Sequence, residues 1–328
     1  MKNTNTTSGG VLNVDSKEMN RMNILNDADF LNFEVEQVKP DIVPAYEYED
    51  LIDDEFDNPD VMSGASLPWA KLKDDFRLRS KEVTLWGGVN GHGKTTLLSH
   101  ICANSLNEKW LIASLEMPIG KTLKKLIKQM GGIENPTKEY RDRLRELTKD
   151  NLWIYNQTDT IPADTIIAML HYATQKLGVK HIILDSLVKC GLGTDDYNGQ
   201  KEFVNKLSGI VKSHDCHIHL VHHVRKGDDE ARIPNKFDVK GAGEITDLVD
   251  NVVIVHRNKK KEALVLKGET HVKINGKDVD IKFIPDVTFR LDKQRHTGIE
   301  GDYGLYFVRG CEQYLNSPHD HVVGLLGR

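Results

Sequence analysis

A glycine-rich run is the part of the sequence whose residue types and spacing most clearly predict chemistry. Residues 88–95 read Gly-Val-Asn-Gly-His-Gly-Lys-Thr, which fits the G-x-x-x-x-G-K-[ST] pattern of a phosphate-binding loop. In such a loop, backbone N–H groups turn toward the phosphates, the lysine reaches the outer phosphates, and the hydroxyl can ligate Mg²⁺. The run therefore predicts a nucleotide site with Mg²⁺ as cofactor and ATP or another NTP as substrate, formed by Gly88, Asn90, Gly91, His92, Gly93, Lys94, Thr95 and Thr96.

Two carboxylates at the ends of apolar segments could complete this site. Asp185 closes the segment His-Ile-Ile-Leu-Asp, and Glu116 closes Leu-Ile-Ala-Ser-Leu-Glu. Hydrolysis needs one acidic group to hold the metal ion and another to orient the attacking water. We expect Asp185 to serve the metal together with Thr95, and Glu116 to serve the water. The alternative is that either carboxylate merely caps the helix that follows it.

The elements that must position these groups alternate between strand and helix along the chain. Apolar segments predict strands at residues 81–87, 109–116, 152–156, 179–187, 216–223 and 251–257. Amphipathic segments between them predict helices, and Pro118 and Pro162 suit helix starts. The expected fold is α/β, a mostly parallel sheet with helices on both faces. Residues 263–283 alternate around the turn Asn275-Gly276, and with residues 288–295 and 303–310 they predict antiparallel strands at the C-terminal end.

Composition excludes several classes of protein. The chain has 328 residues, of which 39% are hydrophobic and 28% charged, as in ordinary globular proteins. It has no apolar run of about 18 residues, so we expect no membrane span and a cytoplasmic location. The four cysteines form no C-x-x-C pair, which argues against disulfides and a zinc ribbon. Histidines crowd residues 214–223, but strand alternation divides them between two faces, so we expect no zinc site there.

Charge divides the chain into regions. Residues 1–66 carry 4 Lys/Arg and 15 Asp/Glu, whereas the remainder carries 40 and 34. We expect a disordered leader at residues 1–14 and an acidic N-terminal arm and linker at residues 15–65. The apolar pattern of residues 15–36 predicts one or two short helices that could link subunits. A motor domain would occupy residues 66–310, followed by a C-terminal tail at residues 311–328.

Further motifs follow the phosphate-binding loop in a fixed order. Ser114-Leu115-Glu116-Met117 stands after the second strand, and His223 ends the strand Cys-His-Ile-His-Leu-Val-His-His. Residues 238–258 contain Asp-Val-Lys-Gly-Ala-Gly before a strand that ends in Arg257, and residues 293–298 read Lys-Gln-Arg-His-Thr-Gly. With these motifs, residues 64–310 resemble the RecA-like motor domain of ring-shaped replicative DNA helicases, the group of DnaB, Twinkle and the phage primase-helicases.

The resemblance implies a RecA-like P-loop NTPase core and assigns several roles. Glu116, Lys94 and His223 would be catalytic, with His223 sensing the γ-phosphate, and Arg295 of the Lys293 motif would act on a neighbouring subunit's nucleotide. Arg257 and Tyr306 would flank the base. The loop after His223 would contact phosphates of single-stranded DNA through Arg225, Lys226, Arg232, Lys236 and Lys240.

The same resemblance implies a ring, expected as a hexamer, that moves 5′ to 3′ on single-stranded DNA and unwinds duplex. The sequence has neither a primase domain nor the helical N-terminal domain typical of DnaB, so we expect a separate primase and a replicative polymerase as partners. Two alternatives stay open from the sequence. One is a RecA- or RadA-like recombinase filament, and the other is a non-translocating ATP-gated binding module such as a helicase loader.

Overall fold

A ten-stranded sheet organises the chain in the computed structural model, which describes residues 23–25, 53, 56–57, 63–193, 195–225, 232–241 and 243–326. Seven strands run parallel in the spatial order β1, β6, β5, β7, β8, β4, β9. Their bounds are β1 Asn23–Leu25, β4 Val83–Gly87, β5 Trp110–Ser114, β6 Leu152–Tyr155, β7 His181–Asp185, β8 His217–Val221 and β9 Asn251–Arg257.

Antiparallel strands extend the sheet beyond β9. They are β12 Val287–Gln294, β13 Gly301–Val308 and β14 Gln313–Leu315. The predicted mostly parallel sheet with antiparallel C-terminal strands is therefore confirmed. Two small sheets lie outside it, formed by β2 Ala65–Ser66 with β3 Arg77–Leu78, and by β10 His271–Ile274 with β11 Lys277–Asp280.

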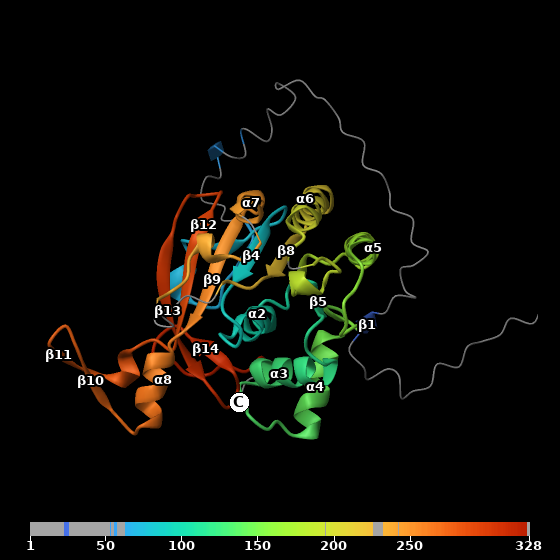
Figure 1. Ribbon diagram of the computed structural model, residues 1–328. Coiled ribbons are helices and arrows are strands. Elements are labelled where there is room, and N and C mark those ends of the chain that lie inside the picture. Colours follow the sequence, from blue (N-terminus) through green and yellow to red (C-terminus); the bar gives the residue numbers. More distant parts are fainter. Residues whose placement is uncertain are drawn as a thin grey trace, which may run out of the picture.

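Helices cover both faces of the sheet (Figure 1). One face packs against α2 Lys94–Ala103 and α3 Ile119–Gly131, with α4 Lys138–Thr148 beside α3. The opposite face packs against α5 Ala163–Gln175, α6 Tyr197–His214 and α7 Gly243–Leu248. Apolar side chains of the strands point alternately to these two layers, because successive residues of a strand face opposite sides. Two buried cores result, one on each side of the sheet.

Three segments differ from what the sequence predicted. Residues 263–266, expected in the alternating region, end helix α8 Lys259–Leu266, which the Asn258 side chain caps by accepting from Lys261 N at 3.0 Å. Asn23–Leu25 lie inside a predicted helix but pair as β1 with β6, whose backbone groups would otherwise lack a partner strand on that side. The segment from Cys311, expected as a tail, adds β14 to the sheet and buries Tyr314.

The turn at Asn275-Gly276 joins β10 to β11 as predicted, and both residues have positive φ. The hairpin pairs only with itself among the described residues, so it does not extend the main sheet. With α8 it stands out from the body of the molecule (Figure 1). The described helices include none that is long and apolar enough to cross a membrane.

Candidate nucleotide site

The phosphate-binding loop joins β4 to α2 and depends on two left-handed glycines. Gly91 and Gly93 have φ of 79° and 90°, values that residues with side chains rarely adopt. A Cβ on Gly93 would also lie 2.7 Å from the Tyr314 hydroxyl oxygen. Lys94 begins α2 and is buried, and its Nζ donates to the Gly88 carbonyl oxygen at 2.8 Å. The loop thus presents backbone and one buried cation at a helix N-terminus, an arrangement that suits phosphate.

A cavity of about 440 Å³ opens beside this loop and collects most of the residues that the sequence predicted. Burial lowers the pKa of the Lys94 ammonium to about 8, although Asp185 and Glu116 oppose the change. The carboxyl ends of the parallel strands deliver these acids to the same edge of the sheet. The predicted residues that line the cavity are Asn90, Gly91, Gly93, Lys94, Thr95, Thr96, Glu116, Asp185 and His223.

Thr95 and Asp185 form the candidate metal site. The Thr95 hydroxyl donates to Asp185 Oδ2 at 2.5 Å, and Asp185 is buried at the end of β7. Burial raises the pKa of the Asp185 carboxyl against the opposing hydrogen bond from Thr95. Mg²⁺ is commonly held by one or two carboxylates together with substrate phosphates and water. A hydroxyl and a carboxylate beside a phosphate-binding loop therefore fit this ion.

Glu116 also lines the cavity and has two hydrogen-bonding neighbours. Its Oε1 accepts from the Ser186 hydroxyl at 2.5 Å and lies 3.5 Å from His223 Nε2. These hydrogen bonds, above all that of His223, lower the pKa of the Glu116 carboxyl to about 2. The side chain is 41% exposed. An ionised carboxylate that is open to solvent can accept a hydrogen bond from a water molecule and orient it.

His223 connects this cavity to the loop that follows β8. Its Nδ1 lies 3.4 Å from Lys94 Nζ, and its carbonyl oxygen accepts from Lys240 N at 3.0 Å. An isolated bridge between Val224 and Val239 closes the loop one step further on. Both ends of the loop therefore meet at His223, next to the place where the outer phosphates would lie.

Lys125 is a residue of the cavity that the sequence did not identify. It lies on α3, where its Nζ donates to the Thr96 hydroxyl at 2.6 Å and lies 3.9 Å from Glu312. Burial lowers the pKa of its ammonium group. Several lysines occur on α3, and the order of residues alone does not reveal which of them faces α2. A second cation thus stands beside Lys94 in the cavity.

The predicted base-flanking residues divide into one at the loop and one further away. Arg257 N donates to His92 Nδ1 at 3.2 Å, and Arg257 Nη1 donates to the Gly91 carbonyl oxygen at 3.3 Å, so this residue adjoins the phosphate-binding loop. Its guanidinium pairs with Glu262 at 2.5 Å. Tyr306 does not line the cavity. Its hydroxyl donates to the Phe283 carbonyl oxygen at 2.9 Å, and its ring faces Lys71 and Lys261.

Lys293 and Arg295 lie at the opposite end of β9 from the phosphate-binding loop. Lys293 Nζ donates to the carbonyl oxygens of Thr246 and Val249 at 2.7 and 2.9 Å, at the end of α7. Arg295 N donates to the Asp250 carbonyl oxygen at 3.1 Å, and its guanidinium pairs with Asp250 at 3.2 Å. The structure therefore does not bring these two residues to the nucleotide cavity of their own chain.

The predicted DNA-contacting cations differ in how freely they are exposed. Arg225 and Lys240 are exposed at the loop's base. Arg232 pairs with Asp238 at 3.0 Å, and Lys236 pairs with Glu300 at 2.9 Å. Lys226 lies outside the described residues. Two of the predicted cations are thus already held by carboxylates.

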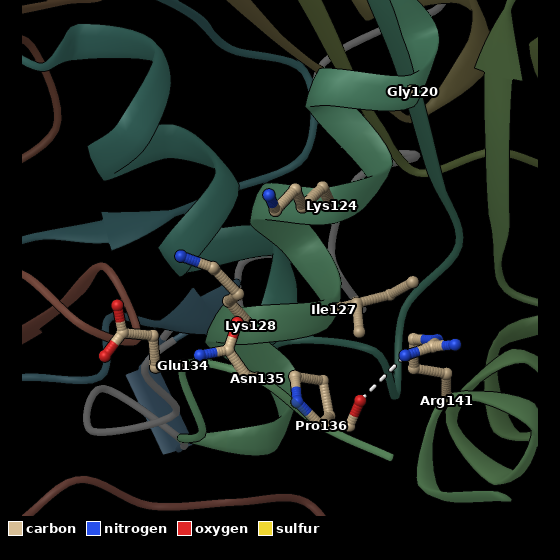
Figure 2. A pocket seen from close by; sticks show the side chains of 8 residues that line it. All are labelled: Gly120, Lys124, Ile127, Lys128, Glu134, Asn135, Pro136 and Arg141. Carbon is tan, nitrogen blue, oxygen red and sulfur yellow. Dashed lines mark hydrogen bonds between the residues drawn. The ribbon is translucent and has the colours of Figure 1, made fainter. Parts of the chain in front are cut away.

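A second cavity of about 350 Å³ lies between α3 and the start of α4 (Figure 2). Lys124, Ile127 and Lys128 line it along α3, and Arg141 of α4 donates to the Pro136 carbonyl oxygen at 2.8 Å. Lys128 Nζ is engaged with Glu312 at 3.7 Å.

The histidines of β8 lie in the core. The rings of His217 and His219 stack with their centroids 4.4 Å apart, and no metal-ligating cluster occurs within the described part of the chain.

Comparisons with known proteins agree with this geometry. A family model described as an AAA domain matches residues 70–229. The chain is 21% identical over 276 residues to a Twinkle homolog protein, chloroplastic/mitochondrial, of Arabidopsis thaliana, a match that covers 78% of this chain and 37% of the relative. It is 23% identical over 208 residues to the DNA helicase/primase of Enterobacteria phage T3, covering 55% and 36%. The chain thus spans little more than a third of the length of these relatives.

Solved structures show the same fold. A DnaB-like replicative helicase, described with its interactions with primase, has a TM-score of 0.64 at 15% identity over 85% of this chain and 68% of that chain. A solved ATPase domain has a TM-score of 0.66 at 16% identity over 84% of this chain and 99% of that chain. Together with the ordered motifs and the nucleotide cavity, these likenesses show that the chain has a RecA-like fold and is similar to the motor domains of replicative helicases.

Proposed function

We propose that this chain is the motor of an NTP-driven replicative DNA helicase, an ATP-dependent enzyme that acts as a homo-oligomeric ring, a hexamer, on single-stranded DNA. The observation that carries the proposal is the single cavity in which Lys94, Thr95, Asp185, Glu116 and His223 converge. These are the groups that phosphoryl transfer to water needs, and they stand at the strand ends where such sites form. The similarity to proteins that are named DNA helicase and replicative helicase supports DNA as the substrate.

The chemistry assigns a role to each group. Lys94 and the backbone of the loop bind the phosphates, while Thr95 and Asp185 would hold Mg²⁺, which neutralises charge on the phosphate oxygens when bound. The ionised Glu116 orients a water whose oxygen attacks the γ-phosphorus, as the bond to the bridging oxygen of the diphosphate breaks. Lys125 is close enough to Thr96 to reach a phosphate if it exchanges that partner.

His223 would pass the outcome of hydrolysis to the DNA-binding loop. Its ring lies beside Lys94 and its carbonyl oxygen is bonded to Lys240 N. Loss of a γ-phosphate would remove a hydrogen-bonding partner from this ring, and segments held by such contacts can change state. The loop would contact DNA phosphates through Arg225, Lys226, Arg232, Lys236 and Lys240, without reading bases.

We propose a ring because the residues that line the nucleotide cavity include no arginine. An arginine that acts on the γ-phosphate would therefore come from another copy of the chain. Arg295, with Lys293 beside it, would supply this charge to a neighbouring copy from the far end of β9. Residues 15–36 would help to link subunits, for which Asn23–Leu25 would have to pair with β6 of a neighbouring copy instead of β6 of their own chain. Normal hexamer formation after deletion of residues 1–60 would contradict the linking role.

The finer features of the function follow the same likeness. We propose 5′ to 3′ movement, unwinding of duplex, a separate primase and replicative polymerase, and action in the cytoplasm of the cell that replicates the DNA. Arg257 and Tyr306 would bracket the base, for which Tyr306 would have to leave its bond to Phe283.

The experiment is steady-state NTP hydrolysis with and without single-stranded DNA, alongside the particle mass with a non-hydrolysable nucleotide. We expect a hexameric mass, strong stimulation by DNA, and loss of hydrolysis in Lys94→Ala. Lys124→Ala, which changes an exposed lysine of the same region, is the control and should retain turnover. Turnover by a monomer that DNA does not stimulate would refute the proposal in favour of an ATP-gated binding module. Helical filaments in place of closed rings would favour a recombinase.

A further inference from the structure

The phosphate-binding loop lies against the end of β9, beyond the point where β4 stops. β4 ends at Gly87 and its pairing with β9 ends at Ile254, whereas β9 continues to Arg257. Among the described residues, the last part of β9 therefore has no strand on the side of β4, and the loop takes that place. The approach is close, because a Cβ on Gly88 would lie 2.6 Å from the Val255 carbonyl oxygen. A loop in this position has to supply partners for the backbone N–H groups that the missing strand would have bonded.

His92 supplies such a partner from the middle of the loop. Its Nδ1 accepts from Arg257 N at 3.2 Å, and its ring packs edge-to-face on that of His256, with the centroids 5.1 Å apart. Burial above all lowers the pKa of the His92 imidazole to about 4, so the ring is neutral near pH 7 and Nδ1 can accept. Unlike both of its neighbours in the loop, His92 does not line the nucleotide cavity, and only 4% of it is exposed. Its side chain thus faces β9 and not the nucleotide.

The side chain of Arg257 makes a second contact with the same loop. Its Nη1 donates to the Gly91 carbonyl oxygen at 3.3 Å, at one of the two glycines that have positive φ. The backbone and the side chain of one residue therefore hold two consecutive residues of the loop, Gly91 and His92. Both contacts use the edge of the guanidinium or the backbone, so they are compatible with a base stacked on the guanidinium face.

Glu262, in the first turn of α8, fixes the direction of the Arg257 guanidinium. Its Oε1 accepts from Arg257 Nε at 2.9 Å and from Arg257 Nη2 at 2.5 Å, while Nη1 reaches Gly91. Arg309 Nη2 donates to the same oxygen at 3.1 Å. The side chain of Asn258 caps α8 directly after Arg257 and so starts the helix that carries Glu262. The order of residues at the end of β9 thereby brings a carboxylate to the arginine that contacts the loop.

We propose that His92 and Glu262 are positioning residues that act through Arg257 to keep the phosphate-binding loop in the conformation that binds nucleotide. The inference rests on the nucleotide site of the proposed function and adds to it two residues that do not line the cavity. A loop that adopts the binding conformation only part of the time has its nucleotide affinity reduced by that fraction. Turnover at saturation should change little, because bound nucleotide holds the loop in place. Loss of either residue should therefore raise Kd and KM more than it lowers kcat.

Two other roles for these residues predict different results. If His92 only filled space beside His256, its acceptor atom would not matter and an apolar side chain of similar size would serve as well. If Glu262 only oriented Arg257 toward a base, ligands without a base would bind equally well in its absence. Inorganic tripolyphosphate has the phosphates of a nucleotide but no base, and it therefore separates an effect on the loop from an effect on base contacts.

The test measures binding of a fluorescent ATP analogue to the full-length chain, displacement of this analogue by tripolyphosphate, and kcat and KM for ATP. His92→Leu removes the acceptor and should weaken the binding of both ligands by roughly fivefold, the effect of one lost hydrogen bond. His92→Asn places Oδ1 as many bonds from the backbone as Nδ1 and should bind several-fold more tightly than His92→Leu. Glu262→Ala should also weaken the binding of both ligands. The matched control is Glu269→Gln, at an exposed carboxylate between α8 and β10, and it should leave binding unchanged.

Because both residues act through Arg257, the double variant His92→Leu with Glu262→Ala should weaken binding by less than the product of the single effects. Melting temperatures well above the assay temperature would show that each variant folds. Unchanged affinity in His92→Leu, no advantage of His92→Asn over it, or a fall in kcat at constant KM would overturn the proposal. Tripolyphosphate affinity that is kept in Glu262→Ala while ATP affinity is lost would overturn it for Glu262. These results leave the proposed function standing, whereas an unmodified chain that binds neither ligand would refute that function and the positioning roles with it.

Discussion

Replacing Arg295 by alanine should abolish hydrolysis while leaving nucleotide binding intact. Arg295 is bonded to Asp250, just before β9, whereas Arg257 at the other end of β9 touches the phosphate-binding loop. Six residue steps of strand separate Asn251 from Arg257, or about 20 Å, which is longer than an arginine side chain. Arg295 therefore cannot act on its own chain's nucleotide without a large rearrangement. An arginine supplied from a neighbour typically contributes roughly 10³-fold or more to turnover.

The assay mixes Arg295→Ala chains with Glu116→Ala chains before assembly. A site works only if one subunit supplies Glu116 and its neighbour supplies Arg295. In a random 1:1 mixture about one site in four meets this condition, so turnover should recover to about a quarter of the unmodified value. Arg143→Ala, an exposed arginine on α4, should retain full turnover by itself. A mixture no more active than its two components, or nucleotide affinity lost in Arg295→Ala as severely as in Lys94→Ala, would refute the assignment.

The remaining predictions concern the loop, the second cation and the buried histidines. Gly93→Ala should lower nucleotide affinity and melting temperature more than Gly91→Ala, because both glycines have positive φ but only at Gly93 is another atom within 4 Å of the added Cβ; equal effects would contradict the reasoning. Lys125→Ala should weaken NTP binding by roughly tenfold, as loss of a charged hydrogen bond does, whereas Lys124→Ala should not, and binding titrations decide this. Burial lowers the pKa of His217 to about 4 and that of His219 well below its usual value. Below pH about 6.5 the unfolded chain then binds more protons than the folded chain, so stability falls as pH drops, by up to about 1.4 kcal/mol per pH unit for each histidine. His219→Phe keeps a ring against Trp110 and should reduce this slope in urea unfolding at several pH values; an unaltered slope would count against buried neutral imidazoles.

The residues of the site that could be predicted from sequence are those fixed by local rules. Gly93, Lys94 and Thr95 belong to one contiguous loop, and Asp185 and Glu116 follow apolar strands whose ends meet at one edge. Lys125 could not be predicted because its role depends on the packing of α3 against α2. The location of Tyr306 away from the cavity depends on the place of β13 in the sheet, outside β12, which the predicted strands alone do not specify.

The structure also explains two errors in the secondary structure that the sequence predicted. Residues 263–266 have apolar side chains that suit a strand, but the cap by Asn258 starts a helix upstream and the chain continues it to Leu266. Asn23–Leu25 have the spacing of a helical face, yet the open side of β6 offers backbone partners that a helix could not use. A capping residue upstream therefore decided the conformation of residues 263–266, whereas a neighbouring strand in space decided that of Asn23–Leu25.

The loop after β8 has two sets of cations. This division bears on how hydrolysis could control the binding of DNA by the loop. Arg232 and Lys236 are held by Asp238 and Glu300, so DNA phosphates would have to displace carboxylates to engage them. Arg225 and Lys240 need no such exchange, and both stand beside His223, whose ring adjoins Lys94. A shift of His223 would move the backbone of these two residues first, because Lys240 N is bonded to the His223 carbonyl oxygen. The nucleotide would then directly control Arg225 and Lys240, which have no ion-pair partner within the described residues, and would control Arg232 and Lys236 only through the exchange of partners.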